Sequence, residues 1–172
     1  MKPTAKILLL VAGLALAACT NPGRFGADGS TGGVGGGSGG AIVPGSANDP
    51  TSTAYFNQTI GDRVLFAVDQ SDLTPEGRAV LDGQSSWLLT NTDFTAIIEG
   101  HADEQGTREY NVGLGARRAN SVREYLISKG VAGNRLRTVS YGKERPIEIC
   151  SNEACYAKNR RAVTVLAGGL TG

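Results

Sequence analysis

The feature that most constrains the fold of this chain is a glycine-rich segment in its N-terminal third. Between residues 23 and 45, 11 of 23 residues are glycine, with serine and threonine among the rest. Such a segment buries too little apolar surface to offset the entropy that ordering would cost. We therefore predict a disordered tether, which divides the 172-residue chain into a short N-terminal part and one C-terminal domain.

The segment before the tether has the pattern of an export signal. Lys2 and Lys6 supply positive charge, and residues 7–15 are apolar apart from Gly13. This run is too short to span a bilayer and ends in small residues, which is typical of a signal peptide. We assign residues 1–18 to it; the alternative is a buried N-terminal helix.

The end of this segment, Leu16-Ala17-Ala18-Cys19, resembles the lipobox of bacterial lipoproteins. The resemblance implies cleavage before Cys19, a diacylglycerol thioether on its sulfur and N-acylation. Several acyl chains on one residue anchor firmly, because each buried methylene contributes about 0.8 kcal/mol. Thr20 stands where enteric inner-membrane lipoproteins often carry Asp, which favours the outer membrane. Residues 19–53 are then the lipidated N-terminus and linker.

Charge and cysteine content narrow the classes of function. The 17 basic and 16 acidic residues leave no basic excess for nucleic-acid binding. Two cysteines remain beside Cys19, and the oxidising compartment of an exported chain favours a disulfide between Cys150 and Cys155. Their spacing is not that of a redox or zinc motif. Free thiols and a redox role are the alternatives, and we expect no metal and no cofactor.

Residues 54–169 carry alternating strand and helix patterns. Strands are predicted at 63–68, 94–99, 136–141 and 161–167, and helices at 73–90, at 107–129 and shortly before residue 160. Thr74 is the expected N-cap of the first helix, and Gly130 is the expected stop of the long one. This order predicts an α/β two-layer sandwich, with helices packed on a mixed four-stranded sheet. The direction of the last strand is left open.

The long helix places two polar residues within its apolar stripe. Asn111 and Arg118 are seven residues apart, so they lie on one face together with Leu114. A lone buried charge is costly, so Arg118 should need a carboxylate from the protein or from a ligand. Asp103, in the loop before this helix, could take a cation while Arg118 takes a carboxylate, which suits an amino-acid zwitterion. An internal Asp103–Arg118 salt bridge without a ligand is the alternative.

Several motifs resemble the OmpA-like peptidoglycan-binding domain family. They are Gly100-His101-Ala102-Asp103, Tyr110-Asn111, Leu114, Arg117-Arg118-Ala119, Tyr141-Gly142 and Asn159-Arg160-Arg161-Ala162-Val163. The resemblance covers roughly residues 54–167. It implies non-covalent binding of the diaminopimelate-containing stem peptide, with Asp103 holding the free amine of that residue and Arg118 its carboxylate.

Other residues are expected around the same groove. The resemblance implies Asn111, Leu114 and the start of the loop after the first strand, near Phe66 and Asp69, and we add His101 as a hydrogen-bonding wall. Many family members have an Asp directly after the residue matching Phe66. This chain has Ala67 there, so a direct role for the first loop is open.

Two other functions are alternatives to wall binding. A peptidoglycan hydrolase would need a nucleophile or a metal, but His101 is the only histidine, and Ser121 and Ser140 lack an evident base. We therefore expect no enzyme. Lipid-anchored members of the family also bind TolB of the Tol system, which is linked to outer-membrane invagination in cell division. A protein-interaction module with secondary wall binding is thus the alternative function.

The sequence predicts an outer-membrane lipoprotein with its head in the periplasm, which tethers that membrane to the cell wall. A flagellar stator subunit is not expected, because stator subunits with this domain have a transmembrane helix and no lipobox.

Overall fold

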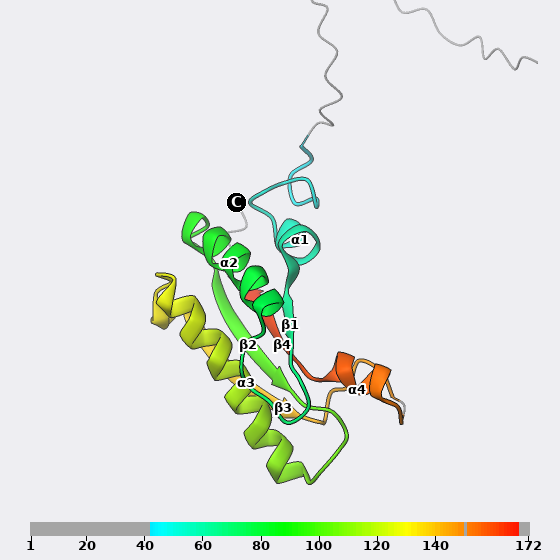
Figure 1. The fold of residues 1–172 in the computed structure, drawn as a ribbon. Coiled ribbons are helices and arrows are strands. Elements are labelled where there is room, and N and C mark those ends of the chain that lie inside the picture. Colours follow the sequence, from blue (N-terminus) through cyan, green and yellow to red (C-terminus); the bar gives the residue numbers. More distant parts are fainter. Residues whose placement is uncertain (1–41, 150, 169–172) are drawn as a thin grey trace, which may run out of the picture. The chain divides into compact units, whose positions relative to one another are not determined.

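The computed structural model describes residues 42–149 and 151–168 (Figure 1). The predicted signal peptide, the lipidation site Cys19 and most of the glycine-rich tether lie outside the described residues, as does Cys150. Within the described ranges, the helices lack the length and apolar composition that a membrane span requires.

Four strands form one mixed sheet in the order β1-β4-β2-β3. Their bounds are β1 (Arg63–Leu65), β2 (Thr95–His101), β3 (Leu136–Gly142) and β4 (Arg161–Ala167). β2 and β3 run parallel, whereas β4 runs antiparallel to both β1 and β2. The predicted mixed sheet is confirmed, and the direction of the last strand is antiparallel.

The first strand is shorter than its predicted range, 63–68. β1 ends at Leu65, and the chain then turns, with the Gln70 amide donating to the Ala67 carbonyl oxygen at 3.2 Å. The apolar run continues through Val68, but the backbone beyond Phe66 leaves the sheet. Hydrophobicity alone therefore overestimated the strand, because an apolar run in a loop has the same composition as one in a strand.

Helices α2 (Pro75–Thr90) and α3 (Arg108–Ser128) cover one face of the sheet (Figure 1). The Thr74 hydroxyl accepts a hydrogen bond from the Gly77 amide, which confirms the predicted N-cap of α2. Thr107 caps α3 in the same way. Gly130 follows α3 with φ 103°, a left-handed conformation that glycine adopts readily and that ends a helix.

The hydrophobic core lies between these two helices and the sheet. Strand residues on the helix side contribute Val64, Ala96, Ile98, Leu136 and Ala162, and the helices contribute Leu81, Leu88, Val122 and Leu126. Successive side chains of a strand point to opposite faces, so the intervening residues face away from the helices. The Trp87 ring of α2 packs against the rings of Phe56 and Phe94, and its centroid lies 5.0 Å from the centroid of each.

A contact between two glycines brings α3 very close to β2. A Cβ on Gly100 would lie only 1.8 Å from the carbonyl oxygen of Gly115, and a Cβ on Gly115 would lie 2.4 Å from the Ser140 hydroxyl. Glycine permits this approach because it has no side chain. The first half of α3 therefore lies directly against the end of β2, next to the loop that follows it.

Ordered structure begins before the predicted start of the domain. Helix α1 (Thr53–Tyr55) continues into the π-helical segment η1 (Phe56–Gly61). Upstream of α1, the Trp87 indole N–H donates to the carbonyl oxygen of Pro50 at 2.7 Å. The last part of segment 19–53, predicted as linker, is thus hydrogen-bonded to the domain, because the buried indole needs an acceptor.

Two further helical elements lie in the C-terminal half. A 3₁₀ turn, η2 (Gly133–Arg135), precedes β3, and helix α4 (Glu153–Asn159) precedes β4, as predicted. Cys155 of α4 is buried and disulfide-bonded. Since Cys150 lies outside the described residues, the pairing of these two cysteines stays a prediction.

Candidate functional site

A groove lies between the start of α3 and the loops that follow β1 and β2. Its volume is about 210 Å³, and it is lined by Val68, Asp69, Asp103, Gln105, Gly106, Tyr110, Asn111 and Leu114. Pockets for drug-sized molecules have volumes of roughly 300–1,000 Å³. The groove therefore accommodates one small group of a larger ligand. The structure brings together four of the predicted site residues here: Asp69, Asp103, Asn111 and Leu114.

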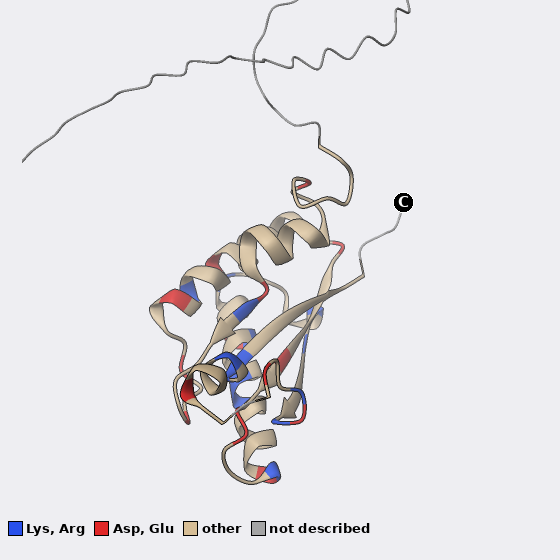
Figure 2. Ribbon diagram, turned by 90° about the vertical axis from the view of Figure 1, so that its right-hand side faces the viewer, with Lys and Arg blue, Asp and Glu red and all other residues tan. Residues whose placement is uncertain are grey.

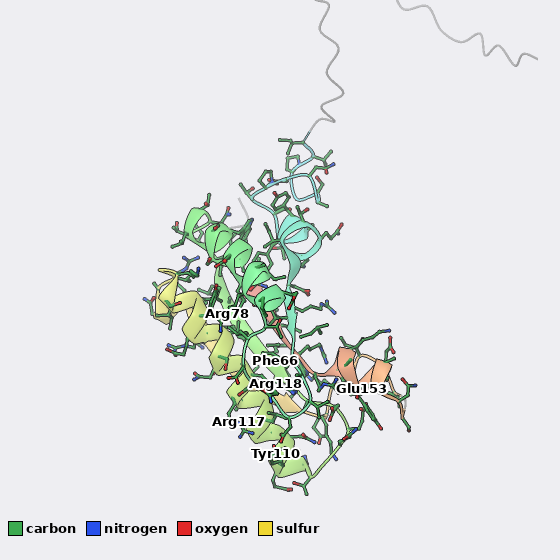
Figure 3. All side chains as sticks on the ribbon, in the orientation of Figure 1. Phe66, Arg78, Tyr110, Arg117, Arg118 and Glu153 are labelled. Atoms are coloured by element: carbon green, nitrogen blue, oxygen red, sulfur yellow. The ribbon has the colours of Figure 1, made fainter. Side chains whose placement is uncertain are left out.

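Arg118 is fully buried one helical turn beyond the groove. Its guanidinium donates to the carbonyl oxygens of Gln70 at 2.8 Å, His101 at 2.8 Å and Ala67 at 3.1 Å. It also lies over the Phe66 ring, 5.3 Å from the centroid, and Figure 3 shows the two side by side. Among the described residues, the acceptors of Arg118 are carbonyl oxygens from the loop after β1 and from the end of β2, and no protein carboxylate pairs with it. A ligand carboxylate as its partner stays a prediction.

The electrostatic state of Arg118 follows from this burial. Loss of water lowers its pKa to about 10, while the Asp103 carboxylate opposes the shift and Arg160 adds to it. Arg118 is therefore still positively charged at neutral pH. Among the described residues, three of its five N–H groups have a carbonyl acceptor. A buried positive charge therefore lies one helical turn beyond the groove.

Asp103 follows β2 and lines the groove with only 7% of its surface exposed. Its Oδ2 accepts from Arg160 at 3.1 Å, and its Oδ1 accepts from the Gln105 amide at 3.2 Å. The predicted alternative, an internal Asp103–Arg118 salt bridge, is wrong: Asp103 pairs with Arg160 instead. Arg160 belongs to a family-like motif of the sequence but is not among the predicted site residues. A buried carboxylate needs a nearby cation, and this need could have indicated an arginine such as Arg160 from the sequence.

The start of α3 supplies one side of the groove. The Asn111 side chain donates to the Gln105 carbonyl oxygen at 2.7 Å, which fixes the preceding loop, and Leu114 adds an apolar surface. The Tyr110 hydroxyl donates to the Asp69 carboxylate, a contact that raises the pKa of Tyr110. Asp69 has φ 56°, unusual for a residue other than glycine. Tyr110 belongs to a family-like motif of the sequence but is not among the predicted site residues.

His101, predicted as a wall of the groove, lies elsewhere. Its neighbour Gly100 faces α3, so its own ring points to the opposite side of the sheet. There the ring lies 5.6 Å from the Tyr141 ring, and Nε2 lies 3.7 Å from the Glu99 carboxylate. Its backbone carbonyl, rather than its ring, faces the site through the contact with Arg118.

Burial also determines the charge of His101. Loss of water, with the positive charges of Arg161 and Arg145, lowers its pKa to about 4. The ring is therefore neutral at pH 7. Phe66, also predicted for the groove, does not line it; its ring lies beneath Arg118 instead.

The chain belongs to the OmpA family, whose model matches residues 65–160. Within this family it is similar to peptidoglycan-associated lipoproteins. The one from Rhizobium meliloti (strain 1021) is 46% identical over 162 residues, which cover 94% of this chain and 87% of the relative. The one from Brucella melitensis biotype 1 is 47% identical over 129 residues, which cover 75% of this chain and 73% of the relative.

Solved structures agree with this assignment. The crystal structure of the peptidoglycan-associated lipoprotein from Burkholderia pseudomallei matches 69% of this chain and 100% of its own, with a TM-score of 0.64 and 33% identity. The C-terminal domain of Helicobacter pylori MotB shares the fold, with a TM-score of 0.59 and 21% identity. The predicted family and the predicted OmpA-like sandwich are confirmed.

Proposed function

We propose that this chain is an outer-membrane lipoprotein that binds the diaminopimelate-containing stem peptide of peptidoglycan and so tethers the membrane to the wall. The observation that carries the proposal is that the Asp103 carboxylate lines a small groove while the buried cation Arg118 lies one helical turn beyond it. A carboxylate and a cation beside one groove suit the ammonium and carboxylate of one zwitterion. The names of the relatives, peptidoglycan-associated lipoprotein, support the same ligand.

Each groove residue has a role in this proposal. Asp103 accepts hydrogen bonds from the ligand's ammonium group. Arg118 stabilises the carboxylate, because the field of a buried cation is weakly screened. The N-terminal end of α3 adds partial positive charge. Asn111 keeps the loop before α3 in place, and Leu114 and Val68 contact the methylene chain between the charged ends.

The energy scale fits a reversible interaction. A hydrogen bond to a charged group contributes about 1.5–3 kcal/mol net. Two or three such bonds, reduced by the cost of ordering the ligand, give a dissociation constant of roughly micromolar size. Many anchored copies on one continuous polymer would then hold the wall firmly through avidity, while each single contact exchanges.

The proposed anchor is lipid on Cys19, supported by the lipobox-like residues before it and by the word lipoprotein in the names of the relatives. Thr20 favours the outer membrane, which leaves the OmpA-like domain in the periplasm. No catalytic role is part of the proposal.

TolB and other Tol proteins are the proposed protein partners, within the Tol–Pal system of envelope integrity and cell division. Exposed apolar side chains suit such a partner: Val68 and Tyr110 line the groove, and Val112 follows on α3. Acidic and basic segments are interspersed at this end of the domain (Figure 2). A partner bound there would cover the groove, so the two ligands would compete.

Co-sedimentation of the detergent-solubilised full-length chain with purified sacculi tests the proposal. Asp103→Asn should lose binding, because it removes the charge that meets the ammonium group. Asp93→Asn is the matched control, since it makes the same charge change at an exposed position before β2. A folded wild-type chain that stays in the supernatant would refute wall binding and make the Tol-partner module the leading function. Release of soluble fragments would instead indicate a hydrolase.

A further inference from the structure

We propose that Arg160 is a positioning residue for ligand binding: it orients the Asp103 carboxylate towards an ammonium group in the groove, and Glu153 of α4 holds Arg160 in place. This inference rests on the proposed function. It extends the binding site to a helix that does not line the groove.

The Asp103 carboxylate is held by one donor on each oxygen. Arg160 donates to Oδ2 at 3.1 Å, and the Gln105 amide donates to Oδ1 at 3.2 Å. The Asp103 and Arg160 side chains are 9% and 5% exposed, so water competes little for this contact. A carboxylate has about four acceptor positions, and these bonds use two of them. The orientation is therefore determined while acceptor capacity remains for a ligand.

Arg160 joins three segments through a single guanidinium. Its Nε donates to the Phe66 carbonyl oxygen at 3.2 Å, at the end of β1. Its Nη1 reaches Asp103 after β2, and Nη1 and Nη2 together form a bidentate pair with Glu153. A planar fork of several N–H groups can make these contacts at once, whereas a lysine ammonium is a compact point charge. The geometry therefore requires arginine.

Glu153 matters for the charge as well as for the geometry. Figure 3 shows it on α4, away from the groove, and its side chain is 64% exposed. Asp103, Arg160 and Glu153 together carry a net charge of −1. If Arg160 paired with Asp103 alone, the two charges would cancel. Because Glu153 shares the guanidinium, Asp103 keeps negative potential for an incoming ammonium group.

Titration calorimetry on the detergent-solubilised full-length chain tests this role with two peptides. One is a synthetic stem peptide that ends in meso-diaminopimelate. The other ends in 2-aminopimelate, which keeps the side-chain carboxylate and lacks the amine. The measured quantity is the ratio of their affinities, because Asp103 acts on the amine and Arg118 on the carboxylate. If Arg160 only stabilised the fold, replacing it would weaken the binding of both peptides equally and leave the ratio of their affinities unchanged.

The variants are Arg160→Lys and Glu153→Gln, with Glu148→Gln as matched control. Glu148, which precedes α4, pairs with Lys158 of α4 at 2.5 Å and, among the described residues, makes no hydrogen bond or ion pair with Asp103 or Arg160. Arg160→Lys should reduce the preference for the amine by about 10- to 100-fold, the equivalent of one charged hydrogen bond. Glu153→Gln should reduce it by about two- to fivefold, as expected of an exposed pair. Glu148→Gln should leave it unchanged.

Two results would overturn the inference, and they are distinguishable. In the first, the wild-type chain binds the diaminopimelate peptide and both variants keep its full preference for the amine. This result would show that Arg160 does not position Asp103, and it would leave the proposed function intact. A wild-type chain that binds neither peptide would refute the proposed function itself. If Arg160→Lys fails to fold, Glu153→Gln decides the question, because Glu153 is exposed and its loss should leave the fold intact.

Discussion

Replacing Gly100 by alanine should force α3 away from β2 and disrupt the groove. The new Cβ would lie 1.8 Å from the carbonyl oxygen of Gly115 and 2.6 Å from its carbonyl carbon. Both are backbone atoms, so no change of side-chain rotamer relieves the contact. Real Cβ atoms essentially never approach another atom within 3.0 Å, so helix and strand must separate by roughly 1 Å.

The magnitude follows from comparing three glycines. Overpacking a core costs about 1–3 kcal/mol and occasionally more, so we expect about 3 kcal/mol or more for Gly100→Ala. Gly115→Ala should cost about 1–3 kcal/mol, because its Cβ would lie 2.4 Å from the Ser140 hydroxyl, which can rotate, and 2.8 Å from the Gly100 carbonyl oxygen, which cannot. Gly113→Ala should stabilise by about 0.5–1 kcal/mol, because its nearest neighbour is the flexible Arg117 side chain at 3.6 Å.

Urea unfolding of the full-length chain, followed by the fluorescence of Trp87, measures these differences. Trp87 is the only tryptophan in the sequence and is buried in the core. Peptide binding should weaken in Gly100→Ala and Gly115→Ala, since α3 carries Asn111 and Arg118, and should persist in Gly113→Ala. A Gly100→Ala chain within about 0.5 kcal/mol of wild type, the range of a neutral surface change, would refute the close approach of α3 to β2.

Three further predictions concern other parts of the domain. His101 is neutral with a pKa of about 4, below its ordinary 6.5, so the unfolded chain takes up its proton first as pH falls. The free energy of unfolding should then fall by about 2 kcal/mol from pH 7 to pH 5, and an equal fall in His101→Gln would contradict this. Trp87→Phe removes the hydrogen bond to Pro50 and should cost about 1 kcal/mol in thermal unfolding; unchanged stability would argue against the early domain start. Reduction of the predicted Cys150–Cys155 disulfide should cost about 2 kcal/mol, and equal thiol titration before and after reductant would exclude the bond.

The helices, strands and family motifs could be predicted from the sequence because their signals are local. Thr74 and Gly130 mark helix ends through their own backbone preferences, whatever packs against them. The motifs identified Asp103, Asn111 and Leu114, which the structure brings into one groove. These residues lie on the start of α3 and the loop directly before it, so helical spacing alone brings them together.

The partners of the buried charges were decided by the tertiary structure. Arg118 is satisfied by carbonyl oxygens that include those of Gln70 and Ala67, about 50 residues away. Asp103 pairs with Arg160, 57 residues away, rather than with the arginine on the neighbouring helix. A sequence shows that a buried charge needs compensation, because desolvation is a property of the group itself. Which group provides that compensation depends on the paths of the loops after β1 and β2, and only the closed fold determines those paths.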